Sequence, residues 1–290
     1  MERCRRIRET TEGCRLAILC ATALEAGPII AAMALTRTLT VASKEMVVGD
    51  LFASEGESAP TLRAVLAITG CDKTNAAHAL TCLLQAMEPA PALVLQVGIA
   101  GALPATGEGG GAYPGDLVVA TREIYADTGS SSPGGWLSAE DIRLPIAFVD
   151  GRECGNTFVL NESLVEAATT ILTAATGGHD GSGLLNGRRV IAGPCVTVSR
   201  VSGLRAEGEE LARKWGAVAE SMEGAAAAHI CTLYAVPFLE IRGISNMVVD
   251  RERASWRVEE AVGAACEAAL SLCRAFDSLP VPAANEDGRN

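Results

Sequence analysis

The segment ESMEGAAAAHICTLYAVPFLEIRGISN, residues 220–246, contains one predicted helix and one predicted strand, the two kinds of element that alternate along the rest of the chain. Its first half, 222–235, is rich in alanine and has helical periodicity, which predicts a helix. Its second half contains PFLEIRG at 237–243, a short apolar run that predicts a strand buried on both faces. A helix that leads directly into a buried strand is typical of a layered α/β sheet.

The same alternation extends along the chain in both directions. Further buried strands are predicted at 16–21, 62–70, 92–98, 116–122 and 189–199. Further helices are predicted at 24–35, 73–88, 161–176, 205–216 and 256–276. Asn161 is a good N-cap for the helix that follows it, and the glycine pair at 177–178 ends that helix.

The chain shows no internal repeat and no break in composition that would divide it into two domains. We therefore predict one domain over 15–278, a disordered basic extension at 1–14 and a disordered tail at 279–290. Two glycine-rich segments, 104–115 and 128–135, contain no lysine and no GK[ST] motif. They are predicted to be flexible surface loops that bind no phosphate.

Composition excludes several function classes. With 24 basic and 35 acidic residues among 290, the net charge of −11 repels phosphate backbones and argues against nucleic acid as a partner. The longest charge-free run, 89–107, contains proline and glycine, so we expect a buried strand and turn there and no membrane span. The ten cysteines contain no CxxC motif and the three histidines share no ligand spacing with them. We therefore expect reduced thiols, a cytoplasmic location, and neither a metal nor a cofactor.

Polar side chains follow several predicted strands at the edge of the sheet where ligands bind in open α/β folds. GIAG at 98–101 follows a buried strand, and its small residues let a ligand approach the backbone. The candidate polar residues at this edge are Glu25, Glu223, Arg242, Ser245 and Asn246.

The order of these features resembles the nucleoside phosphorylase and nucleosidase superfamily, and within it the methylthioadenosine/adenosylhomocysteine nucleosidases. The motifs that carry the resemblance are LAILCATALEA (16–26), LVLQVGIAGAL (93–103), PGDLVVATREIYAD (114–127) and the 220–246 segment. The resemblance implies a three-layer αβα sandwich with a twisted, mostly parallel but mixed central sheet. It also implies a homo-oligomer, a dimer or larger, in which a neighbouring subunit's loop covers the 5′ side of the site.

The resemblance implies that three residues are catalytic. Glu25 is the base that activates water against the anomeric carbon, and Glu223 holds the ribose 2′ and 3′ hydroxyls. A carboxylate near the ribose stabilises the oxocarbenium-like charge that develops during N-glycosidic cleavage. The third residue, Asn246, contacts the purine.

The implied substrate-binding residues are Ile99, Ala100 and Gly101 beside the sugar, Val196, Thr197 and Val198 beside the base, Met222 against the sugar face, and Ser245. Arg242 orients the acidic side chains from behind. A buried structural ion pair is an equally good interpretation of this arginine.

Two positions depart from the adenine-specific nucleosidases. Asn246 stands where they carry an aspartate; its amide offers an acceptor for N7–H and a donor for O6, which suits a 6-oxopurine such as hypoxanthine. Ser221 stands where they carry a glutamate, so one ribose or water contact differs.

Within the superfamily, ESMEG, IRGISN and the D-R-x-x-x-W segment at 250–256 resemble the futalosine hydrolases. That family removes hypoxanthine from futalosine, a nucleoside with a carboxyphenyl ketone at C5′, on an alternative bacterial route to menaquinone. The resemblance implies apolar room and a cation at the far end of the site. Trp256 with Arg251, Arg253 or Arg257 could supply these groups, and a solvated helix start is the competing interpretation.

Other functions remain open from the sequence. A purine nucleoside phosphorylase would share the fold, but it needs cations for phosphate, whereas the segment CATALEAGP supplies Glu25 and no arginine. An adenine nucleosidase is disfavoured by Asn246. A non-catalytic nucleoside-binding module would be expected to have lost its base, yet both Glu25 and Glu223 are present.

Overall fold

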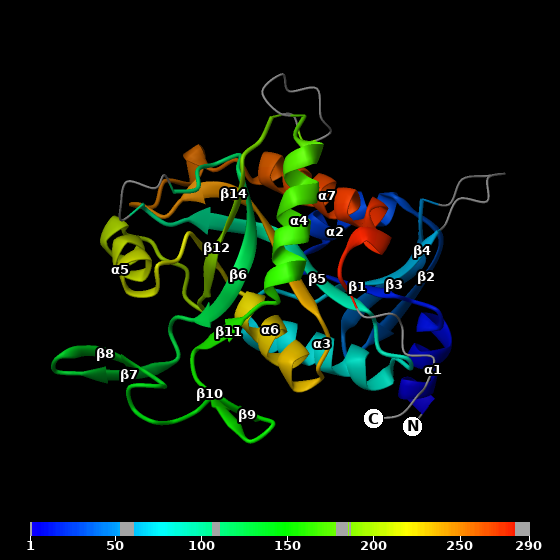
Figure 1. The fold of residues 1–290 in the computed structure, drawn as a ribbon, viewed down its shortest axis with the longest axis horizontal. Coiled ribbons are helices and arrows are strands. Elements are labelled where there is room, and N and C mark those ends of the chain that lie inside the picture. The colour runs from blue at the N-terminus through cyan, green and yellow to red at the C-terminus, as the bar shows by residue number, and fades with distance from the viewer. Residues whose placement is uncertain (1, 53–60, 106–110, 178–184, 186, 282–290) are drawn as a thin grey trace.

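A computed structural model of the protein describes residues 2–52, 61–105, 111–177, 185 and 187–281 (Figure 1). Most of the predicted 279–290 tail and part of the 104–115 loop lie outside these residues. Within the described residues, ten strands form one mixed sheet in the order β11-β6-β12-β13-β5-β1-β4-β3-β2, with β14 paired to both β5 and β6.

The strands of this sheet are β1 (Leu16–Cys20), β2 (Met33–Val41), β3 (Lys44–Leu51), β4 (Leu62–Ile68), β5 (Leu93–Ala102), β6 (Leu117–Tyr125), β11 (Thr157–Val159), β12 (Val190–Thr197), β13 (Ala219–Ser221) and β14 (Phe238–Met247). Two separate hairpins are β7 (Gly129–Ser132) with β8 (Gly135–Ser138), and β9 (Ala147–Val149) with β10 (Arg152–Cys154). Figure 1 shows both hairpins projecting away from the sheet at the lower left.

Five of the strands close into a small barrel. β5 pairs with β14, β14 with β6, β6 with β12, β12 with β13, and β13 again with β5. The β14–β5, β12–β6 and β12–β13 pairs are parallel, whereas the β14–β6 and β13–β5 pairs are antiparallel. Side chains that point into this ring are removed from water, so any charged group there needs a partner inside the protein.

Helices cover both faces of the sheet, which confirms the predicted αβα sandwich (Figure 1). On one face α2, α4 and α7 pack together, and α1, α3 and α6 pack together on the other. The α-helices are α1 (Glu2–Thr11), α2 (Ala23–Ala31), α3 (Lys73–Ala86), α4 (Glu162–Ala175), α5 (Arg205–Trp215), α6 (Gly224–Leu233) and α7 (Val258–Arg274). The short 3₁₀ turns are η2 (Arg253–Ser255) and η3 (Phe276–Ser278). Asn161 caps α4 as predicted, because its side chain accepts a hydrogen bond from Leu164 N–H.

Three expectations about local structure were wrong. The helix predicted to reach residue 35 ends at Ala31, because Met33 already pairs with Leu51 in the β2–β3 hairpin. The basic N-terminal segment, expected to be disordered, forms α1, whose Ile7 is buried in the core and whose Arg8 pairs with Glu88. The segment at 128–135, expected to be a flexible loop, forms most of the β7–β8 hairpin.

None of the helices among the described residues is long and apolar enough to cross a membrane. No group of three or more histidine, cysteine or acidic side chains within the described ranges could hold a metal ion.

Candidate active site

A cavity of about 330 Å³ opens where β1, β5, β13 and β14 end. Eight of the twelve predicted site residues line it: Glu25, Ile99, Ala100, Gly101, Met222, Glu223, Ser245 and Asn246. These eight residues come from four separate stretches of the chain, which therefore meet at one place. Ser221 also lines this cavity, and its buried hydroxyl has no hydrogen-bond partner among the described residues.

Glu25 is held at the start of α2 by a capping box. Its Oε2 accepts hydrogen bonds from the backbone N–H of Thr22 at 2.9 Å and from the Thr22 hydroxyl at 2.8 Å, and Thr22 Oγ1 accepts from Glu25 N–H. Its Oε1 accepts from Ile99 N–H at 3.1 Å. These bonds fix a buried carboxylate at the cavity wall, and each of its oxygens retains lone pairs for a proton.

Gly98 lets two charged side chains approach the backbone of β5. A Cβ at this position would lie 2.6 Å from Glu25 Oε1 and 2.7 Å from Arg242 Nη1. Any other residue at 98 would therefore displace the candidate base or the arginine. The glycine is therefore required for the close approach of these two side chains, whereas the GIAG motif was predicted to admit a ligand.

Glu223 lies at the N-cap of α6 and faces the same cavity. Its Oε1 accepts from Asp72 N–H at 3.2 Å, and its Oε2 accepts from Arg242 Nη1 and Nη2 at 3.3 Å each. Burial raises the pKa of Glu223, and the positive charge of Arg242 opposes that rise. The carboxylate is thus stabilised from behind and leaves lone pairs for hydroxyl donors in the cavity.

Arg242 is 1% exposed and lies behind the cavity rather than lining it. Besides Glu223, its Nε donates to Glu240 Oε1 at 2.6 Å and its Nη1 donates to the Ile99 carbonyl at 3.2 Å. The arginine therefore combines both interpretations made from the sequence. It forms a buried ion pair, and through that pair it orients Glu223.

Asn246 is oriented by its neighbours on β14. Its Oδ1 accepts from the Ser245 hydroxyl at 2.8 Å, and its Nδ2 donates to the Met247 carbonyl at 3.0 Å. One N–H and one oxygen lone pair of the amide remain for a ligand. Both groups can be hydrogen-bonded at once only by a ligand whose edge carries an acceptor next to a donor.

The structure does not bring Val196, Thr197 and Val198 to the cavity. β13 lies between β12 and β5, since Val196 pairs with Glu220 and Glu220 pairs with Gly101. Val196 and Val198 pack instead in a separate apolar cluster with Leu103 and Ile124. A three-residue strand such as β13 is too short to give a recognisable pattern, which is why sequence reasoning placed these residues wrongly.

Glu220 is a cavity residue that the sequence analysis missed. It occupies β13, its Oε1 accepts from Ser202 N–H at 2.9 Å, and its Oε2 accepts from the Ser202 hydroxyl at 2.5 Å. Burial raises the pKa of Glu220. Its position two residues before Met222 in the ESMEG motif was the available signal.

Arg251 and Trp256 lie at one end of the cavity. The Arg251 guanidinium stacks 4.8 Å from the centre of a Trp256 ring, and within the described part of the chain no carboxylate pairs with it. Arg253 and Arg257 do not line the cavity, and Arg257 faces Glu260 at 3.8 Å. Of the three arginines considered from the sequence, the structure brings Arg251 to the site.

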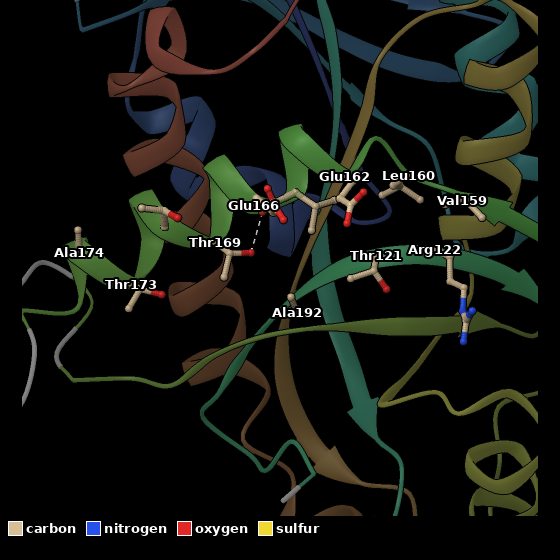
Figure 2. Close-up of a pocket in the computed structure, with 12 residues that line it drawn as sticks. Thr121, Arg122, Val159, Leu160, Glu162, Glu166, Thr169, Thr173, Ala174 and Ala192 are labelled. Carbon is tan, nitrogen blue, oxygen red and sulfur yellow. Dashed lines mark hydrogen bonds between the residues drawn. The ribbon is translucent and has the colours of Figure 1, made fainter. Parts of the chain in front are cut away.

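A second, larger cavity of about 1200 Å³ lies along α4 and the neighbouring strands β6, β11 and β12, and Figure 2 shows the side chains that line it. None of the predicted site residues lines it. Its polar side chains include Glu162 and Glu166 on α4 and Arg122 on β6 (Figure 2). The convergence of buried, hydrogen-bonded carboxylates distinguishes the smaller cavity as the candidate active site.

A family profile described as the Phosphorylase superfamily matches residues 15–278. The chain belongs to the phosphorylase superfamily. Among curated relatives of this superfamily member, a futalosine hydrolase of Thermus thermophilus is 33% identical over 204 residues, which cover 70% of this chain and 78% of that protein. A futalosine hydrolase of Streptomyces coelicolor is 34% identical, over 59% of this chain and 65% of that protein. These matches confirm the family resemblance predicted from the motifs.

Solved structures of the superfamily show the same fold. A 5′-methylthioadenosine/S-adenosylhomocysteine nucleosidase from Neisseria meningitidis, in complex with methylthio-immucillin-A, matches with a TM-score of 0.70 and 22% identity over 90% of this chain and 98% of that one. A native futalosine hydrolase of Helicobacter pylori matches with a TM-score of 0.69 and 18% identity over 92% and 98%.

Proposed function

We propose that the protein hydrolyses the N-glycosidic bond of futalosine and releases hypoxanthine and dehypoxanthine futalosine. The proposal places it on the alternative route to menaquinone. The observation that carries it is the pair of buried carboxylates, Glu25 and Glu223, fixed on one cavity that the amide of Asn246 also lines. The similarity to the Thermus and Streptomyces futalosine hydrolases supports the choice of substrate.

Each residue has a defined step in this reaction. Glu25 accepts a proton from water as the water oxygen bonds to C1′, and the C1′–N9 electron pair leaves with the base. Glu223 accepts hydrogen bonds from the ribose hydroxyls, and its negative charge stabilises the oxocarbenium-like sugar. The departing hypoxanthine takes up a proton from solvent at N7; Asn246 then accepts from that N7–H and donates to O6.

Hydrolysis fits the charges of the cavity better than phosphorolysis does. Arg251 is the only basic side chain among the described residues that line it. Arg242 is committed to Glu223 and Glu240 and is nearly inaccessible. A phosphate beside the ribose would therefore meet Glu25 and Glu223, and among the described lining residues only Arg251, at one end of the cavity, is a cation without a carboxylate partner.

An isotope experiment tests hydrolysis directly. The reaction is run on futalosine in ¹⁸O-labelled water with phosphate present, and the sugar product is analysed by mass spectrometry. We expect one ¹⁸O atom at C1′ of that product. A sugar 1-phosphate without the label would contradict the proposal.

Asn246→Asp is expected to shift the preference from hypoxanthine towards adenine nucleosides. The aspartate loses the N–H donor that meets O6, so the ratio of kcat/KM values for inosine and adenosine falls by roughly tenfold or more. Asn161→Asp is the matched control, because aspartate caps α4 as well as asparagine does and this residue lies outside the cavity. An unchanged ratio in Asn246→Asp would remove Asn246 from base recognition.

Arg251→Gln is expected to weaken binding of the carboxyphenyl end of futalosine. An exposed charge-assisted contact contributes about 1 kcal/mol, so KM for futalosine rises roughly fivefold while KM for inosine, which lacks that group, stays the same. Arg253→Gln is the control, since Arg253 does not line the cavity. Equal changes for both substrates would argue against a carboxylate contact at Arg251.

We further propose a homo-oligomer and a cytoplasmic location. The family resemblance supports the first. The free cysteine thiols among the described residues, including buried Cys20, Cys195 and Cys231, support the second.

A further inference from the structure

Two carboxyl side chains that the proposed reaction does not use lie inside the barrel. Glu123 on β6 and Glu240 on β14 are both 0% exposed. A buried ionised carboxylate is costly unless each of its oxygens is hydrogen-bonded, so the partners of these four oxygens can be traced one by one.

One oxygen of each carboxyl has a donor. Thr197 Oγ1 accepts from Ala225 N–H at 2.8 Å, so its own proton is free to be donated to Glu123 Oε2, at 2.7 Å. Glu240 Oε1 accepts from Arg242 Nε at 2.6 Å. These bonds account for every donor that reaches the two carboxyl groups from the described chain.

The other two oxygens face each other. Glu123 Oε1 and Glu240 Oε2 are buried and have no hydrogen-bond partner when both groups are treated as carboxylates. Both lie within 2.5 Å of a single point, the position that a Cβ on Gly224 would occupy. Two negative oxygens this close in the protein interior would repel strongly, whereas one proton between them satisfies both.

We propose that Glu123 and Glu240 share a single proton and that this acid pair positions Arg242, and through it Glu223, for the proposed reaction. Glu123 is the neutral member and donates to Glu240 Oε2. Glu240 keeps one negative charge, which holds Arg242 Nε. The two remaining arginine nitrogens then point to Glu223 Oε2.

The groups around the pair agree with this assignment. Burial raises the pKa of Glu123 well above the ordinary range, and the neighbouring charge and hydrogen bond of Glu240 raise it further. Thr197 and Arg242 act in the opposite direction. Burial also raises the pKa values of Tyr125 and Cys195, so neither supplies a second negative charge at neutral pH. The charged and titratable groups that face the pair are Arg242, Glu223, Tyr125 and Cys195.

Glu123→Ala and Glu123→Gln test the positioning role together. Alanine leaves Glu240 Oε2 without a donor and frees Arg242 to move, so kcat/KM for futalosine falls roughly tenfold or more. Glutamine has the same shape, donates an amide N–H to Glu240 and accepts from Thr197, so it restores most of the lost activity. If Glu123 were instead an ionised carboxylate in the wild-type protein, the neutral glutamine would not replace its negative charge. Glutamine would then fail to restore the kcat/KM that is lost in Glu123→Ala.

A second measurement does not depend on the substrate or on the function proposed above. The folded protein keeps a proton on Glu123 that the unfolded chain releases near pH 4, so the free energy of unfolding falls as pH rises above that value. Glu123→Gln has no such proton, while Glu220 and Glu223 titrate in both proteins and cancel. Urea midpoints are measured from pH 5 to pH 8 for both.

We expect the midpoint of the wild-type protein to fall with pH relative to that of Glu123→Gln. Parallel curves would overturn the shared proton, even if alanine fails to fold. A diverging pair of curves with no rescue of kcat/KM by glutamine would overturn the positioning role. Loss of futalosine cleavage by the wild type would instead reject the proposed function and leave the titration result standing.

Discussion

We expect Glu25→Gln to lower kcat for futalosine by roughly 10²- to 10⁴-fold, the usual contribution of a general base, with little change in substrate affinity. The amide cannot accept a proton from water, yet glutamine still fits the capping box in which Glu25 accepts from Thr22. The fold should therefore remain intact. Steady-state kinetics gives the loss in kcat, ligand titration gives the affinity, and urea unfolding checks the fold.

The matched control for this variant is Glu207→Gln. Glu207 occupies the same capping position in α5, where its Oε2 accepts from Gly203 N–H at 2.8 Å and Leu204 N–H at 3.2 Å, but it lies outside the cavity. It should retain full activity. Full activity in Glu25→Gln as well would show that Glu25 is only a helix cap.

We expect Arg242→Met to destabilise the protein by about 3–5 kcal/mol, since removing one partner of a buried ion pair leaves an uncompensated charge. Here two carboxyl groups, Glu223 and Glu240, lose their cation, and the Ile99 carbonyl loses a donor. Methionine fills much of the same space, so the decrease in the free energy of unfolding reflects the lost positive charge rather than lost packing. Urea unfolding measures it, and kcat/KM falls in the same variant because Glu223 loses its orientation.

Arg205→Met is the control for this loss. Arg205 pairs with Glu209 at 3.7 Å on the surface of α5, and both side chains are more than half exposed. An exposed pair of this kind contributes less than about 1 kcal/mol. Comparable small losses for both arginines would mean that Arg242 is not the cation on which the buried carboxylates depend.

The alternation of buried strands and alanine-rich helices was sufficient to predict the layers of the fold, because each element is long enough to show its period. β2 and β3 were not predicted from the sequence. The alanines before Met33 continue a helical pattern that only pairing with Leu51 interrupts. In α1, six of the ten residues are charged, and the helix is held in place by the burial of Ile7 against the rest of the chain. Such contacts have no local signal.

The residues that line the cavity were predictable where a family motif contains them, as at Glu25, Glu223 and Asn246. Side-chain contacts were not predictable from the sequence where they depend on how the barrel strands pair with one another. Thr197 was expected beside the base, and its hydroxyl instead bonds Glu123 inside the barrel. Glu123 and Glu240 each sit within an apolar strand, and nothing in either strand reveals that the β14–β6 and β12–β6 pairings bring them together.

The most direct test of the central claim is chromatographic measurement of the base released from futalosine, inosine and methylthioadenosine, each with and without phosphate. We predict that hypoxanthine is released from futalosine without phosphate, faster than from inosine, and that methylthioadenosine yields little adenine. Cleavage that requires phosphate, or release of adenine alone, would contradict the account.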